Sequence, residues 1–259
     1  MTAPGTVPTA AVSLRDVSVS YGQRQAVDGI TLQVRPGERV ALVGPSGAGK
    51  STLLGLCNGT VAPSSGEVQV LGSDPARASG RALKRLRRRI GTVHQQLHLI
   101  GPLRVVHNVN AGQLGRWGPW RALRSLIRPL QVDQAREALA RMGIAGHLHS
   151  RTDRLSGGEQ QRVALARVLV QDPELVLADE PVSSLDPARA EEVMRLLCGL
   201  LEESPRRRTL VVSLHDFDLA VRHCDRVVGL RHGRVVLDLP ADEVDERARE
   251  RLYELDPDR

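Results

Sequence analysis

Apolar positions recur at two different spacings along the chain, and segments with one spacing alternate with segments that have the other. Short runs in which Val, Ile and Leu alternate with polar residues, or follow one another, are typical of β-strands. Such runs are Val12–Val19, Ile30–Val34, Arg39–Val43, Glu67–Leu71, Leu175–Ala178, Thr209–Leu214, Arg226–Leu230 and Val235–Leu237. Longer segments with apolar residues three or four apart predict helices. These segments run from near Lys50 to Asn58-Gly59, over most of 81–170, over Pro187–Glu203 and over Ala241–Leu255.

This alternation predicts an α/β fold, with a mainly parallel sheet covered by helices on both faces. The first two strands, Val12–Val19 and Ile30–Val34, are joined by Tyr21-Gly22-Gln23 and neighbouring polar residues. We expect an antiparallel β subdomain at the N-terminal end. The stretch 81–170 interrupts the alternation and is expected to be an inserted helical subdomain. We therefore expect a flexible N-terminus at 1–10, a single domain at 11–240 and a charged C-terminal helix and tail at 241–259.

The composition excludes several classes of protein. The chain has 259 residues, of which 41% are hydrophobic and 24 are Gly, the level of an ordinary folded domain rather than a disordered chain. No stretch approaches the roughly 18–20 apolar residues of a membrane-spanning helix, and the N-terminus does not resemble a secretion signal. We therefore expect a protein made and kept in the cytosol. Cys57, Cys198 and Cys224 form no CxxC pair, so we expect buried thiols.

The charge is mildly positive, with 36 basic and 30 acidic residues and a formal net charge of +6. Seven basic residues lie between Arg77 and Arg89 without an acidic one. Such a run can contact nucleic acid, anionic lipid or an acidic protein surface, or it can be a solvated helix face. No aromatic residue that could stack on bases lies among them, so we expect no nucleic-acid partner.

A phosphate-binding loop is predicted at Gly44–Ser51, which matches G-x-x-x-x-G-K-[ST] after a strand and before a helix. Its backbone N–H groups and the start of the following helix can surround phosphate oxygens. Lys50, one of only two lysines, can reach the β- and γ-phosphates, and the Ser51 hydroxyl can hold Mg²⁺. The residues expected at the nucleotide are Gly44, Pro45, Ser46, Gly47, Ala48, Gly49, Lys50, Ser51 and Thr52.

Two adjacent carboxylates, Asp179 and Glu180, end the apolar run Leu175–Ala178. Asp179 can bind Mg²⁺, and Glu180 is then free to polarise an attacking water as a general base. Together with the phosphate loop, this pair predicts nucleoside triphosphate hydrolysis.

A second anion-binding helix start is predicted within Leu155–Val163, whose sequence is LSGGEQQRV. One nucleotide needs only one such loop, so the second indicates an antiparallel dimer in which each chain covers the nucleotide held by the other. Ser156, Gly157, Gly158 and Glu159 are then expected at the partner's nucleotide.

LSGGEQQRV is the signature sequence of the ATP-binding subunits of ABC transporters, and the chain resembles this family from Val12 to Leu239. The resemblance implies the fold of the ABC ATPases. It also implies that Tyr21 stacks on adenine, that Gln95 joins Mg²⁺ and the attacking water to the helical subdomain, and that His215 contacts the γ-phosphate.

The resemblance further implies that the loop Ser183–Asp186 crosses the dimer interface, with Asp186 at the nucleotide. Two positions depart from the family's usual residues. His94 stands where Phe is usual, and Ser184 replaces a common Ala.

The transported substrate is indicated only by a finer resemblance. The segment Leu214–Val228 and the ending around Leu252-Tyr253 look like the phosphonate importer ATPases. Gly115–Arg121 lies where that subfamily has an aromatic-rich segment, so Trp117 and Trp120 are either a contact surface or local packing.

As a member of this family, the chain would use ATP and Mg²⁺ at the cytoplasmic face of the cell membrane. Its partners would be permease subunits, contacted by the helical insert and the Gln95 region, a second ATPase subunit and an extracytoplasmic substrate-binding protein.

Three alternatives stay open. The chain could serve an exporter or a lipoprotein-release system, or act as a soluble ABC ATPase on DNA or ribosomes. A P-loop kinase is also possible, but it gives no role to Leu155–Gln161.

Overall fold

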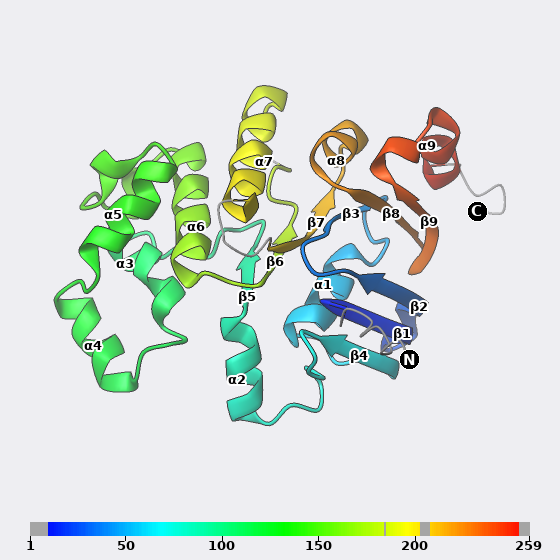
Figure 1. Ribbon diagram of the computed structural model, residues 1–259, viewed down its shortest axis with the longest axis horizontal. Coiled ribbons are helices and arrows are strands. Elements are labelled where there is room, and N and C mark those ends of the chain that lie inside the picture. The colour runs from blue at the N-terminus through cyan, green and yellow to red at the C-terminus, as the bar shows by residue number, and fades with distance from the viewer. Residues whose placement is uncertain (1–9, 184, 203–207, 254–259) are drawn as a thin grey trace, which may run out of the picture.

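The computed structural model describes residues 10–183, 185–202 and 208–253 (Figure 1). Residues 1–9 of the expected flexible N-terminus, residues 254–259 of the expected C-terminal segment and the departure at Ser184 lie outside the described residues. Within the described ranges, the chain forms two sheets and a group of helices at one end of the molecule (Figure 1).

The larger sheet has six strands in the order β5-β6-β7-β3-β8-β9. Their bounds are Ile90–Val93, Leu175–Asp179, Thr209–Leu214, Arg39–Val43, Arg226–Arg231 and Arg234–Pro240. The neighbours from β5 to β8 pair in parallel, and β9 pairs with β8 antiparallel. The mainly parallel sheet predicted from the sequence is therefore confirmed.

Alternate residues of these strands enter two different hydrophobic cores. Val40 and Leu42 of β3 pack on one face of the sheet, while Ala41 and Val43 pack on the other. The central strands are therefore apolar at nearly every position, as parallel strands covered on both faces must be. A slip of one residue would exchange the two sets of side chains, so burial on both faces fixes the strand register.

The smaller sheet and one helix cover the first of these faces. The sheet has the order β2-β1-β4, with β1 at Val12–Tyr21, β2 at Arg24–Val34 and β4 at Ser65–Val70. Both of its pairings are antiparallel, as predicted. Helix α1, Lys50–Asn58, contributes Leu53 and Leu56 to the core that the two sheets share.

Helices cover the second face of the larger sheet. They are α7 (Pro187–Glu202), α8 (Phe217–His223) and α9 (Glu246–Tyr253). Part of the predicted helix Ala241–Leu255 is instead a short 3₁₀ turn, Ala241–Glu243, which precedes α9.

The helical subdomain lies at one end of the molecule, on the left in Figure 1. It consists of α3 (Val105–Asn110), α4 (Pro119–Ile127), α5 (Val132–Arg141) and α6 (Gly157–Gln171). Helix α6 packs against α3 and α5 and also against β5, so it connects the subdomain to the sheet.

The stretch 81–170 is not helical throughout, because it contains strand β5. Ile90, Thr92 and Val93 of this strand favour β structure, but the run has only four residues and follows the basic helix α2, Gly80–Arg88, so its strand signal is weak. Pairing with β6 across Ile90↔Leu175 to Val93↔Ala178 supplies the hydrogen bonds that stabilise it. The helical subdomain therefore begins after β5.

The side chains singled out by composition have different environments. All three cysteines are buried, as predicted. Trp117 is buried, with 5% of its surface exposed, and the guanidinium of Arg121 lies 5.3 Å from its ring centroid. Trp120 is 83% exposed. Only Trp120 therefore offers a surface, and Trp117 is local packing.

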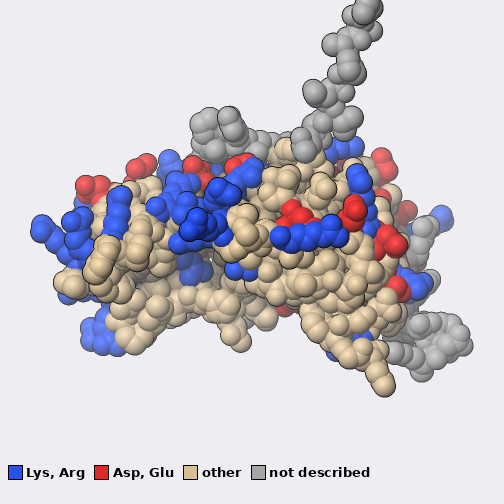
Figure 2. Space-filling model, turned by 90° about the horizontal axis from the view of Figure 1, so that it is seen from below, with Lys and Arg blue, Asp and Glu red and all other residues tan. Residues whose placement is uncertain are grey.

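The basic run around α2 has several internal partners. Arg87 donates to the carbonyls of Asn58 and Gly59 at the end of α1, and Arg89 pairs with Glu174 at 2.6 Å. Lys and Arg side chains gather on the lower face of the molecule, the side on which α2 lies (Figure 2). Among the described residues, no helix is long and apolar enough to span a bilayer.

Candidate active site

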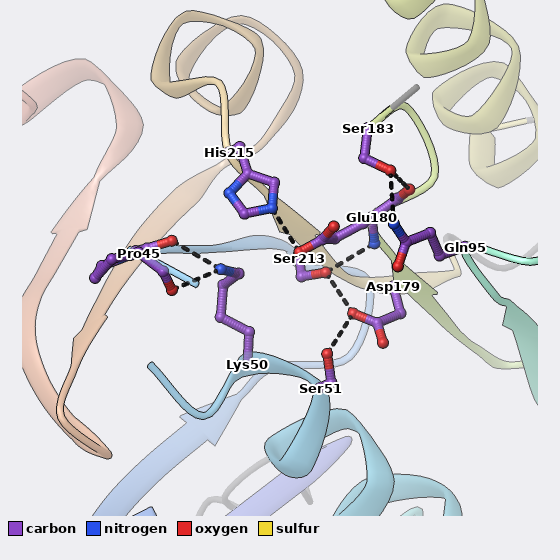
Figure 3. A network of polar contacts seen from close by, with 10 residues as sticks. Pro45, Lys50, Ser51, Gln95, Asp179, Glu180, Ser183, Ser213 and His215 are labelled. Carbon is purple, nitrogen blue, oxygen red and sulfur yellow. Dashed lines mark hydrogen bonds and ion pairs between the residues drawn. The ribbon is translucent and has the colours of Figure 1, made fainter. Parts of the chain in front are cut away.

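The predicted catalytic residues meet because they follow neighbouring parallel strands. Gln95 follows β5, Glu180 follows β6, His215 follows β7 and the loop beginning at Gly44 follows β3. Because β5, β6, β7 and β3 are adjacent in that order, their carboxyl ends deliver these residues to one edge of the sheet (Figure 3).

The backbone of the phosphate loop requires glycine at two positions. Gly44 has φ +146° and Gly49 has φ +105°, values that favour glycine. A Cβ atom on Gly44 would lie 2.1 Å from the Leu230 carbonyl oxygen, and one on Gly49 would lie 2.5 Å from the Ala26 oxygen. The loop is thus packed directly against neighbouring backbone, and α1 begins at its end, with Gly49 as N-cap.

Lys50 is buried at the first position of α1, and its ammonium is directed back into the loop. The Nζ atom donates to the carbonyls of Gly44 at 2.7 Å and Pro45 at 3.1 Å (Figure 3). Burial lowers the pKa of Lys50, and the nearby carboxylates of Glu180 and Asp179 act in the opposite direction. The site therefore holds a compact cation beside two acids.

Asp179 is held by two hydroxyl groups. Ser51 donates to its Oδ1 at 3.1 Å, and Ser213 donates to the same oxygen at 2.7 Å. The Ser213 hydroxyl also accepts from the backbone N–H of Glu180 at 2.8 Å. Ser213 thus fixes both carboxylate-bearing residues, although sequence reasoning did not select it. The available signal was a single polar residue in the otherwise apolar end of β7.

Glu180 and His215 are paired with each other. The His215 Nε2 and the Glu180 Oε1 atoms lie 2.6 Å apart, and Glu180 has φ +47°. The left-handed backbone turns the chain sharply at the end of β6, so the Glu180 side chain diverges from that of Asp179 (Figure 3). The two carboxylates therefore have separate partners: Ser51 and Ser213 for Asp179, and His215 for Glu180.

Gln95 approaches from the other side of Glu180. Its Nε2 donates to the Ser183 hydroxyl at 3.3 Å, and that hydroxyl donates to the Glu180 carbonyl oxygen at 3.3 Å. Ser183, the first residue of the predicted interface loop, thus contacts both Gln95 and the backbone of Glu180 (Figure 3).

Many of these residues line one cavity of about 650 Å³, whereas Gly44, Pro45 and Asp179 lie outside its lining. Its lining includes the predicted residues Tyr21, Ser46, Gly47, Ala48, Gly49, Lys50, Ser51, Thr52, Gln95, Glu180 and His215. Tyr21 is 54% exposed at the cavity rim. Arg24 also lines the cavity but was not predicted, although it pairs directly with Tyr21 across the β1–β2 hairpin. The volume is in the range of small-molecule sites.

The second predicted helix start lies outside this cavity. Ser156 caps α6: its hydroxyl accepts from the Glu159 N–H, and the Glu159 carboxylate accepts from the Ser156 N–H at 2.8 Å. The Ser156 N–H and the Ser156 hydroxyl both donate to the Glu159 carboxylate, and these two bonds lower the pKa of Glu159. A different hollow, of about 330 Å³, is lined by Ser156, Gly158 and Glu159 together with Leu185.

Gly157 and Gly158 differ from the loop glycines, because a Cβ atom on either would meet nothing within 4 Å. Asp186 is also outside the first cavity and accepts from the Arg189 N–H at the start of α7. One chain therefore brings most of the phosphate loop together with Gln95, Glu180 and His215 in one cavity. It leaves Ser156–Glu159 and Asp186 outside that cavity.

Comparison with known proteins places the chain among nucleotide-dependent transport proteins. The sequence profile of the ABC transporter family matches residues 27–183. The "Phosphonates import ATP-binding protein PhnC" of Pseudomonas putida is 46% identical over 248 residues, covering 96% of this chain and 91% of that protein. The protein of the same name from Anaeromyxobacter dehalogenans is 49% identical over 247 residues. That alignment covers 95% of this chain but only 49% of the longer relative.

Solved structures show the same architecture. The structure of cbiO1 from Clostridium perfringens, part of the ABC transporter complex cbiONQ, has a TM-score of 0.76 and 31% identity. The match covers 90% of each chain. The dimeric structure of MJ0796, a bacterial ABC transporter cassette, has the same TM-score and identity and covers 89% of this chain and 98% of that one.

Proposed function

Because the chain belongs to the ABC transporter family, we propose that it is the ATP-binding and ATP-hydrolysing subunit of an importer for phosphonates. The observation that carries the enzymatic part is the meeting of Lys50, Glu180 and His215 in one cavity at the end of the sheet. The substrate part is supported by the 46–50% identity to proteins named for phosphonate import.

ATP binds with its phosphates in the loop Gly44–Ser51 and its adenine against Tyr21. The Lys50 ammonium is a point charge suited to the β- and γ-phosphates. Tyr21 is exposed at the rim of the cavity, so its ring is accessible for stacking.

Mg²⁺ is proposed to bind at Ser51, Asp179 and Gln95. The Ser51 hydroxyl and the Asp179 carboxylate are already 3.1 Å apart, and hard oxygen donors of this kind suit Mg²⁺. In the described part of the chain, no cluster of three or more His, Cys, Asp or Glu provides an alternative metal site. When bound, the ion neutralises charge on the phosphates.

Glu180 acts as the general base. Its carboxylate accepts the proton of the attacking water, while the Nε2 of His215 holds Oε1 and keeps the carboxylate oriented. Ser213 holds the Glu180 backbone, so the base is fixed at both its main chain and its side chain. A position fixed in this way reduces the cost of reaching the transition state.

The complete site contains two chains. Ser156, Gly157, Gly158 and Glu159, with Asp186, complete the nucleotide site of a second copy, and the dimeric MJ0796 structure supports this arrangement. Each ATP then bridges two chains, and loss of its γ-phosphate lets the dimer open.

The resulting motion is used by permease subunits, and we propose a peripheral location at the cytoplasmic face of the membrane. An extracytoplasmic substrate-binding protein completes the system. Helix α4 supports a docking role for the helical subdomain, because Trp120, Leu123 and Ile127 of its surface are exposed apolar side chains.

Reconstitution tests the proposal. The chain is placed in proteoliposomes together with the permease and the binding protein of a phosphonate importer. We expect ATP-dependent uptake of 2-aminoethylphosphonate, and none with the Glu180→Gln variant. Hydrolysis without phosphonate uptake would overturn the substrate assignment, and absence of hydrolysis would overturn the enzymatic one.

A further inference from the structure

The segment that follows Gln95 has an unusual backbone. Leu97 and His98 are consecutive non-glycine residues with φ +51° and +46°. Side chains disfavour this left-handed conformation, so two such residues in succession persist only where surrounding contacts hold them.

One arginine of α6 supplies such contacts. The two terminal nitrogens of Arg167 donate to the carbonyl oxygens of this pair, at 3.0 Å to His98 and 2.8 Å to Leu97. Burial lowers the pKa of Arg167, so its guanidinium has lost much of its contact with water. A planar guanidinium can bind two adjacent acceptors at once, which a lysine ammonium cannot do in the same geometry.

A second contact holds the same segment to the helical subdomain. Asn108 of α3 is buried, accepts from the Ile100 N–H at 2.9 Å and donates to the Ile100 carbonyl at 3.0 Å. The chain beyond Gln95 is therefore attached to α3 and α6, while Gln95 itself reaches Ser183 beside Glu180.

Helix α6 also carries the second anion-binding helix start. Its first residue, Gly157, is about ten residues before Arg167, which is about 15 Å along a helix. One helix thus presents Ser156 and Gly157 to the partner's nucleotide at its start and holds the Gln95 segment of its own site farther along.

We propose that Arg167 is a positioning residue that sets the placement of Gln95 and links it to α6. Through this contact, binding of a nucleotide at Ser156 changes the position of Gln95 in the chain's own active site. The inference rests on the proposed function, because it assigns a regulator to the Gln95 of that same site. Its physical basis is a short connection: Arg167 of α6 bonds the Leu97 carbonyl, two residues of chain lead from Leu97 back to Gln95, and Gln95 is hydrogen-bonded through Ser183 to the Glu180 carbonyl.

A double-mutant cycle on the full-length protein tests the link. ATP turnover, the KM for ATP and thermal unfolding are measured for Arg167→Ala, Gln95→Ala and the double variant. We expect Arg167→Ala to lower kcat at least about tenfold while leaving the KM for ATP nearly unchanged, because a displaced catalytic group costs rate. In the Gln95→Ala background, Arg167→Ala should cause no further loss.

Arg167→Lys and Gln113→Ala are the matched variants. Arg167→Lys keeps the charge and one carbonyl contact, so it should recover part of the lost rate. It also replaces Arg167→Ala in the cycle if the alanine variant does not fold. Gln113 is buried and donates to the Val170 carbonyl of the same helix, away from Gln95. Gln113→Ala should keep the wild-type kcat.

If the fold-losses in kcat of the two single variants multiply in the double variant, the proposal is overturned, because Arg167 would then act independently of Gln95. Wild-type turnover of Arg167→Ala would also overturn it. Neither result would affect the proposed function. That function fails instead if Glu180→Gln and Gln95→Ala both hydrolyse ATP as the wild type does.

Discussion

The two anion-binding helix starts of this chain are built in opposite ways. The first, at Gly44–Ser51, is packed against its own molecule: its glycines touch the Leu230 and Ala26 carbonyls, and Lys50 is buried beneath two carboxylates. The second, at Ser156–Glu159, is capped by its own side chains, and the glycines that follow Ser156 have open space around them.

The difference indicates why each helix start contains glycine. Glycine at position 44 stabilises the fold of its own chain, because a Cβ atom there would collide with backbone. A Cβ atom on Gly157 or Gly158 would meet none of the described residues within 4 Å, which leaves room for a group that approaches from outside. We propose that this group is the nucleotide of the second subunit.

The largest expected effect on ATP turnover comes from replacing Glu180, which lies in the cavity of the first helix start. Glu180→Gln should lower ATP turnover by about 10²–10⁴-fold, because it removes a general base, and an ATP-bound dimer should accumulate. Phosphate release and light scattering measure the two effects. Glu174→Gln, a change of another carboxylate immediately before β6, is the control and should turn over normally. Wild-type hydrolysis by Glu180→Gln would remove this residue from its proposed role.

Ser156→Arg should disable the second region while leaving the first intact. Blocking the partner's site should reduce turnover by about a hundredfold through misplaced reacting groups. The affinity of each chain for nucleotide should stay unchanged, and loss of the cap should cost about 1 kcal/mol of stability.

Ser79→Arg is the matched control, because Ser79 also caps a helix but belongs to α2. Combined with Glu180→Gln, Ser156→Arg should abolish the ATP-dependent dimer, whereas Ser79→Arg should not. A dimer that persists with Ser156→Arg would count against a site shared between chains.

Alanine at the two kinds of glycine separates folding from function directly. Gly44→Ala should lower the free energy of unfolding by about 2–4 kcal/mol, because of a positive φ and a backbone collision. Gly157→Ala should change it by less than about 0.5 kcal/mol. Urea denaturation measures both values, and equal losses would contradict the distinction drawn between the two loops.

The smallest expected effect is at the rim of the first cavity. Tyr21→Ala should raise the Kd for ATP about tenfold, because base stacking on an aromatic ring contributes about 1–3 kcal/mol. Tyr21→Phe keeps the ring and should bind normally. Calorimetric titration provides the measurement, and an unchanged Kd for the alanine variant would exclude stacking.

The sequence was most informative where local pattern and final burial agree. The central strands are continuous apolar runs because both faces of the sheet are covered, and they were predicted to within a few residues. Strand β5 was missed because its four residues become a strand only by pairing with β6. The polar half of β2, from Arg24 to Gly29, was missed for a similar reason: pairing with β1 determines it.

The active site shows the same division. Lys50 and Glu180 were predicted because each belongs to a contiguous motif whose residue types and spacing are typical of phosphate binding and hydrolysis. Ser213, Arg24 and Arg167 belong to no motif and acquire their contacts through sheet register and helix packing. The two tryptophans, three residues apart, are similar in sequence but opposite in burial, since α4 turns Trp120 outward.

The placement of these tryptophans gives the protein a built-in optical reporter. Trp117 and Trp120 are the only two in the chain, and both lie in or beside α4 of the helical subdomain. Tryptophan emission therefore reports on this subdomain alone, and a soluble quencher such as iodide should reach Trp120 far more readily than Trp117. Any emission change on addition of ATP would thus show, without an added label, that nucleotide binding has altered the surroundings of the helical subdomain.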